Sequence, residues 1–171
     1  MELPHIIMLM AAAVAAYTDT RTGLIPNWLT LPAVVLGPLY FLVMASSDLA
    51  LASLGAILIV GLVPFMMYRS GSMGGGDVKI FAALGGLGGL MLGLEVMLYS
   101  LCVAMVLSLF VMAKQGHLKV VMANVGRILV NPLLPKDRKM SLERRKMHQM
   151  RLGLSILLGT ALALGSDYAL V

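Results

Sequence analysis

The sequence contains a single cysteine, Cys102, and few charged residues, which make up 12% of its 171 positions. A lone cysteine excludes a framework of disulfides within the chain and any zinc site built from several cysteines. Soluble domains carry about 25% charged residues, whereas this chain is 60% hydrophobic. Such a composition is typical of a protein that lies in a bilayer, where lipid solvates the apolar faces of the helices.

The first twenty residues contain no Lys or Arg. This absence is informative because "MLMAAAVAAYTD", residues 8–19, has small residues spaced as in a signal-peptide cleavage site. A secretory signal peptide also needs a basic segment before its apolar core. We therefore expect this segment to be retained as the first helix of the protein.

Six apolar runs are long enough, or nearly long enough, to cross a bilayer. They cover residues 3–22, 28–46, 49–68, 76–95, 94–113 and 152–171. The predicted fold class is all-α: a polytopic membrane protein of about six transmembrane helices, forming one domain over 1–171. "LGLE", residues 92–95, predicts a tight hairpin between the fourth and fifth runs. Gly85 and Gly89 share one helical face and predict a close contact between helices.

The basic residues are expected on one side of the membrane only. With six crossings, all 13 Lys and Arg residues lie on the same side, most of them in the basic loop 114–151. The positive-inside rule makes that side cytoplasmic, so both termini are expected to face outward. Apolar residues at helical spacing predict an interfacial amphipathic helix over 118–129. The basic run 136–146 is expected to contact anionic lipids. The positive net charge thus reports topology, and we expect no nucleic-acid partner.

Two of the eight acidic residues, Asp19 and Asp77, fall at one expected depth. A helix that begins at Leu3 places Asp19 about 24 Å along its axis, roughly one turn from the cytoplasmic boundary. A crossing that ends at Glu95 begins near Gly76, which places Asp77 at the same boundary. Acids within membrane segments are costly and rare, so both residues are candidates for function.

Each aspartate also has a simpler explanation: Asp77 could cap the fourth helix, and Asp19 could be a loop residue paired with Arg21. Together they could form the ion site of a transporter, but the internal repeat and mid-membrane polar ligands common in transporters are absent. Paired carboxylates share a proton, so that one activates water while the other polarises a carbonyl oxygen. Gly74 and Gly76 would let a substrate backbone approach Asp77 closely.

Two segments contain the aspartates: "GGGD", residues 74–77, and "DTRTGLIPNWLT", residues 19–30. The first fits the G-x-G-D motif and the second is similar to the first-aspartate segment of the type IV prepilin peptidases, a family of intramembrane aspartic proteases that this chain therefore resembles. The resemblance implies that Asp19 and Asp77 are the catalytic pair. It also implies a prepilin-like precursor as substrate, whose basic leader is cleaved at the cytoplasmic face just before an apolar helix.

This chemistry requires no metal, and the three histidines show no ligand spacing, so we expect no metal and no cofactor. Larger members of the resembled family carry a cysteine-rich, zinc-binding insertion, and its absence here argues against methyltransferase activity. The short form is similar to the peptidases of Flp/tight-adherence pili, and pilus assembly machinery is a possible partner. An archaeal preflagellin peptidase with the same chemistry is the alternative within this resemblance.

Residues beside the two aspartates have expected roles of their own. Pro26 and Asn27 predict the start of a helix, with Asn27 as its cap and indirect positioning of Asp19 as the alternative. Trp28 is expected to anchor the interface. Lys79 is expected to fix topology; alternatively, it tunes the charge of Asp77 or attracts substrate.

Overall fold

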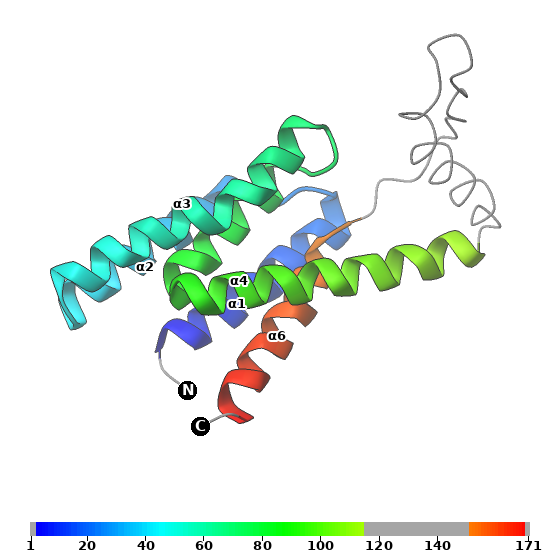
Figure 1. Cartoon of the computed structure of the whole chain (residues 1–171). Helices are drawn as coiled ribbons and strands as arrows, with labels where there is room; N and C mark the ends of the chain where they lie inside the picture. Colours follow the sequence, from blue (N-terminus) through cyan, green and yellow to red (C-terminus); the bar gives the residue numbers. More distant parts are fainter. Residues whose placement is uncertain (1–2, 115–150, 170–171) are drawn as a thin grey trace, which may run out of the picture. The chain divides into compact units, whose positions relative to one another are not determined.

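The computed structural model describes residues 3–114 and 151–169, which are helical apart from short connections and include no strand. The helices are α1 (Leu3–Thr22), α2 (Asn27–Met44), α3 (Ser47–Arg69), α4 (Gly75–Lys114) and α6 (Gly153–Ala169) (Figure 1). The chain forms two compact units, one of residues 1–104 with 151–171 and one of residues 105–150. The prediction of an all-α fold is confirmed.

Four of the described helices, α1 to α4, are long and apolar enough to cross a membrane, and α6 is a shorter apolar helix. Large apolar side chains point outward along α2 and α3; Val35 is 61% exposed and Leu58 is 74% exposed. Apolar surface of this extent marks a face that contacts a membrane or a partner. These observations confirm a polytopic membrane protein, while the count of six crossings stays a prediction.

Helix α4 is interrupted at Gly89, whose φ of 79° and ψ of −179° are not helical and are open essentially only to glycine. Figure 1 shows α4 changing direction sharply along its length. A methyl group at Gly93 would lie 2.6 Å from Gly85 Cα, so the two arms of α4 touch beside the break. The hairpin predicted at 92–95 was therefore wrong in position, because those residues are helical and Gly89 makes the turn.

Small residues let the first arm of α4 pack closely against α2 and α3. A methyl group at Gly85 would lie 2.8 Å from Val60 Cβ, and one at Gly37 would lie 2.5 Å from the carbonyl carbon of Gly86. The Ser53 hydroxyl donates a buried hydrogen bond of 2.6 Å to the Gly86 carbonyl oxygen. The predicted close contact is confirmed at Gly85 but not at Gly89, where a methyl group would meet nothing within 4 Å.

Helices α1 and α6 lie side by side (Figure 1). Buried apolar residues from α1, α3, α4 and α6 form one core in the described part of the chain. Its fully enclosed members are Met8, Ala12, Ala15, Val60, Ile80, Phe81, Leu84, Leu87, Val96, Ile156 and Ala163. Alanines on α1 allow α6 to approach it closely, as small residues do at helix contacts in membranes.

The predicted interfacial helix over 118–129 and the basic run 136–146 lie outside the described residues. The unit that contains them is described only for its first ten residues, 105–114, which form the end of α4.

Candidate active site

Asp19 lies in the last turn of α1 and is buried, with 6% of its surface exposed. Its Oδ2 accepts a hydrogen bond of 2.8 Å from the backbone N–H of Gly153, the first residue of α6. The start of a helix carries unpaired N–H groups and a partial positive charge, so it stabilises a carboxylate. The alternative in which Asp19 is a loop residue paired with Arg21 is wrong: Asp19 is helical, and the Arg21 guanidinium lies 5.4 Å from the Tyr17 ring centre.

Asp77 lies in the first turn of α4 and is half-buried. Its Oδ2 accepts a hydrogen bond of 3.1 Å from the Gly74 N–H, and its own N–H donates to the Gly74 carbonyl at 3.2 Å. This reciprocal pattern resembles a capping box, in which the third helical residue reaches back to the residue at the cap. The expected cap contact is therefore present, and it uses one of the two carboxylate oxygens.

Two contacts join the segment after Asp19 to the segment around Asp77. Ile25 packs on the glycine turn so closely that a methyl group at Gly76 would lie 2.9 Å from Ile25 Cβ and 3.2 Å from its carbonyl oxygen. Farther along, Lys79 Nζ donates a hydrogen bond of 2.9 Å to Asn27 Oδ1. The structure thus brings together two motifs that are about 50 residues apart in sequence.

The two carboxylates share one feature that bears on chemistry. In each, Oδ2 accepts a backbone N–H, from Gly153 for Asp19 and from Gly74 for Asp77. Within residues 3–114 and 151–169, neither Oδ1 accepts a hydrogen bond of its own. An oxygen without an internal partner can bind a water or a shared proton, as catalysis by a pair of acids requires.

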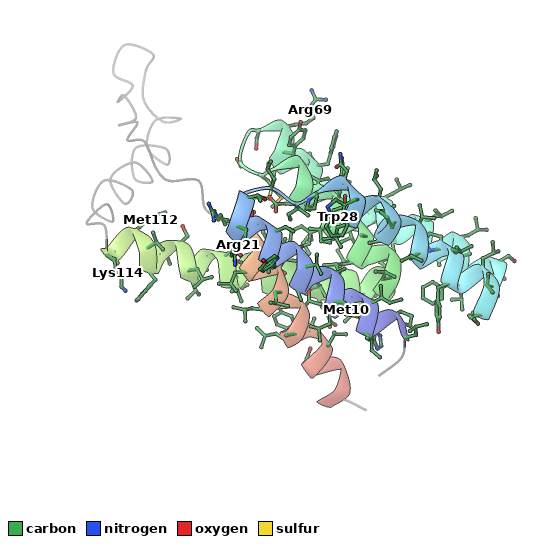
Figure 2. All side chains as sticks on the ribbon, turned by 180° about the vertical axis from the view of Figure 1, so that it is seen from behind. Met10, Arg21, Trp28, Arg69, Met112 and Lys114 are labelled. Atoms are coloured by element: carbon green, nitrogen blue, oxygen red, sulfur yellow. The ribbon has the colours of Figure 1, made fainter. Side chains whose placement is uncertain are left out.

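Asn27 does not have the capping role that its sequence position predicts. Helix α2 does begin there, but its cap residue is Pro26, with φ −75° and ψ 148°, and no side chain caps the helix. Asn27 is already helical, and its Oδ1 is bound by Lys79. Trp28, expected at the membrane interface, projects from the first turn of α2 (Figure 2) and is 67% exposed.

Sequence reasoning missed the contribution of α6. The Arg151 guanidinium donates a hydrogen bond to the Thr20 carbonyl oxygen. Two residues later in the sequence, the Gly153 N–H donates to Asp19. In Figure 2, Arg21 marks the end of α1, beside the start of α6. A glycine after a basic segment signals a helix boundary, but nothing local points to a partner 134 residues away.

No group of three or more His, Cys, Asp or Glu side chains suited to a metal ion occurs among the described residues. The candidate site consists of the two carboxylates, the glycine N–H groups that bind them and the Lys79–Asn27 hydrogen bond.

Comparison of the sequence with known proteins identifies its family. Residues 6–111, which include both aspartates, match the type IV leader peptidase family. A segment of 82 residues is 35% identical to "Prepilin peptidase EppA" of Methanothermobacter thermautotrophicus, covering 46% of this chain and 21% of that relative. The chain thus spans about a fifth of the length of the curated relative. No solved structure matches the chain. With well over half of its length matched by the family, this chain belongs to the type IV leader peptidase family.

Proposed function

We propose that the protein is a prepilin leader peptidase, an aspartic endopeptidase in which Asp19 and Asp77 activate a water molecule. The family match covers both aspartates and supports leader cleavage as the reaction. The observation that carries the proposal is the contact between the two motif segments, through Ile25 on Gly76 and through Lys79 on Asn27. This contact joins the segment that follows Asp19 to the turn that precedes Asp77.

The chemistry follows from the charges of the pair. Two carboxylates whose charges interact do not both ionise easily, so they share one proton. The ionised member takes a proton from water, and the protonated member donates its proton to the peptide carbonyl oxygen as the water attacks the carbon. The amine leaves after it gains a proton from the acid that received the water proton. As the C–N bond breaks, the other acid takes back a hydroxyl proton from the tetrahedral intermediate, which restores the singly protonated pair. The Gly74 and Gly153 N–H groups fix one oxygen of each acid and leave the other for these transfers.

The proposed substrate is a prepilin-like precursor with a basic leader in the cytoplasm and an apolar helix in the membrane. Asp19 at the end of α1 and Asp77 at the start of α4 stand at helix termini. Helix termini lie at the membrane boundary when the helices cross it. Cleavage at the cytoplasmic face, just before the apolar helix of the substrate, suits acids at such a level. The proposed location is the cytoplasmic membrane, with both chain termini outside.

The test is cleavage of a prepilin-like precursor by the purified protein in lipid vesicles. We expect Asp19→Asn and Asp77→Asn to lower kcat by about 10²- to 10⁴-fold, the usual contribution of a positioned general acid or base. Asp48→Asn is the matched control, because Asp48 is an exposed acid in the first turn of α3. Normal cleavage by either site variant would sink the assignment of the pair.

The substrate class is resolved by offering a preflagellin-like precursor alongside the prepilin-like one. Faster cleavage of the prepilin-like precursor supports the proposal, and faster cleavage of the preflagellin-like precursor replaces it with the archaeal alternative. If neither precursor is cleaved while vesicles with this protein take up protons or cations through the two aspartates, the transporter alternative holds instead.

A further inference from the structure

We infer that Gly153, at the start of α6, is a positioning residue for Asp19: its N–H holds Oδ2, and its missing side chain makes room for the carboxylate. This inference rests on the proposed function, because it concerns the orientation of one of the two proposed catalytic acids. Gly153 lies outside the motifs at residues 19–30 and 74–77 and outside the family match, which ends at residue 111.

The contact is direct and enclosed. The Gly153 N–H lies 2.8 Å from Asp19 Oδ2, and both residues are buried. A hydrogen bond between a neutral donor and a carboxylate is stronger than one between two neutral groups, and burial strengthens it further. The first N–H groups of a helix have no partner within the helix. The carboxylate of Asp19 therefore satisfies a group that would otherwise be left unpaired in the core.

Only glycine fits at position 153. A methyl group there would lie 2.7 Å from Asp19 Cβ, 2.9 Å from Ala16 Cα and 3.0 Å from Asp19 Oδ2. One of these neighbours, Ala16 Cα, is a backbone atom of α1, and Asp19 Cβ is bonded directly to that backbone, so the clash is relieved only when α1 and α6 move apart or the end of α1 shifts. Either movement changes the direction in which the free oxygen of Asp19 points.

The same arrangement holds Asp77, which argues that it serves the site and not the packing of α6 alone. Gly74 donates its N–H to Asp77 Oδ2, and a methyl group at Gly74 would lie 3.0 Å from that oxygen. Each acid thus accepts the N–H of a glycine through Oδ2, and a methyl group at either glycine would press on that oxygen. The two glycines come from different parts of the chain and meet their acids from different elements, the glycine turn and the start of α6.

Arg151 fixes the approach of α6 to the end of α1. Its guanidinium donates to the Thr20 carbonyl oxygen, one residue after Asp19. A cation at the end of a helix also interacts favourably with the helix dipole. Arg151 and Gly153 together hold the start of α6 against the last turn of α1.

The test uses three glycines of α6. Gly153→Ala places a methyl group against Asp19, while Gly159→Ala places one 2.5 Å from the Ser100 backbone nitrogen, in a helix contact away from the acids. Gly165→Ala is the neutral control, because a methyl group there meets nothing within 4 Å. We expect Gly153→Ala to lower kcat roughly 10²-fold without changing KM, since small displacements of a reacting group cost about this much. We expect Gly159→Ala to reduce thermal stability and leave kcat per folded molecule unchanged.

Amide exchange gives a readout that does not depend on cleavage. In protein labelled with ¹⁵N-glycine, Asp19→Ala is expected to speed hydrogen exchange at the Gly153 N–H, while Asp19→Asn, which keeps an oxygen acceptor, preserves its protection. Asp77→Ala is expected to leave the Gly153 amide unchanged. Equal exchange in the Asp19→Ala variant and the unmodified protein would overturn the contact itself.

The outcomes separate the two proposals. If the unmodified protein cleaves precursor and Gly153→Ala cleaves it with the same kcat, the positioning role is refuted and the proposed function stands. A loss of kcat in Gly159→Ala equal to that in Gly153→Ala would also refute it, because packing of α6 would then explain both. If neither the unmodified protein nor the Gly165→Ala control cleaves precursor, the proposed function is refuted. The positioning role is then refuted as well, even if amide exchange confirms the contact between Gly153 and Asp19.

Discussion

The hydrogen bond between Lys79 and Asn27 offers a direct test of how the two motifs are held together. Lys79 Nζ donates to Asn27 Oδ1 at 2.9 Å, and both side chains are exposed. If Lys79 acts as a tether, its effect on cleavage passes through Asn27. If it fixes topology, tunes Asp77 or attracts substrate, its effect is independent of Asn27.

The size of the effect follows from the exposure of the pair. A hydrogen bond to a charged group contributes about 1.5–3 kcal/mol, but solvent reduces exposed charged pairs to at most about 1 kcal/mol. We therefore expect a coupling of about 0.5–1 kcal/mol. Since 1.36 kcal/mol corresponds to a tenfold change in rate, each single variant should lower cleavage roughly 2- to 5-fold.

The assay is a double-mutant cycle on kcat with Lys79→Met, Asn27→Ala and the double variant. The tether predicts that the double variant is no slower than the slower single variant, because the second change removes nothing more. Asn27→Asp should retain activity, because an ion pair replaces the hydrogen bond. Arg69→Met, an exposed basic residue at the end of α3, controls for the loss of one positive charge. A double variant whose loss equals the product of the single losses would refute the tether.

Two further predictions concern packing around the glycines. Ser53→Ala should lower the free energy of unfolding by about 1–3 kcal/mol, because it leaves a buried carbonyl of α4 without its donor; heating followed by size-exclusion chromatography measures this against Ser47→Ala on the same helix. Gly76→Ala should abolish most cleavage, because the methyl group would lie 2.9 Å from Ile25 Cβ, whereas Gly75→Ala meets its nearest neighbour at an ordinary 3.5 Å and should cleave normally. Equal activities of the two alanine variants would contradict this account of the glycine turn.

The positions of the helices were largely predictable because the apolar runs are long and separated by polar residues. The first run predicted residues 3–22, and α1 covers Leu3–Thr22. The turn within α4 was not predictable from the same signal. "GGLGGL" and Gly93 offer several glycines, and which one takes a positive φ depends on the arms that pack beside it. Gly89 turns because Gly85 and Gly93 then meet without side chains between them.

The candidate active site was also predictable only in part from local sequence. Local motifs identified Asp19 and Asp77 as candidates and correctly predicted a cap contact at Asp77. They assigned Asn27 to its own helix start, although its side chain binds a lysine 52 residues away. Local sequence predicts what a residue can do with its neighbours along the chain. It does not show which residue from a distant part of the chain binds that side chain in the folded protein.

The dependence of Asp19 on α6 has a consequence for the order of events during synthesis. The N–H that holds Asp19 comes 134 residues later in the chain. At about 5–20 residues per second, a ribosome needs roughly 7–27 s to make that stretch. Until α6 has been made, the Asp19 carboxylate lacks the hydrogen bond from the Gly153 N–H. The proposed acid pair is thereby completed only after α6 has been synthesised, so a nascent chain that ends before α6 is expected not to cleave precursor.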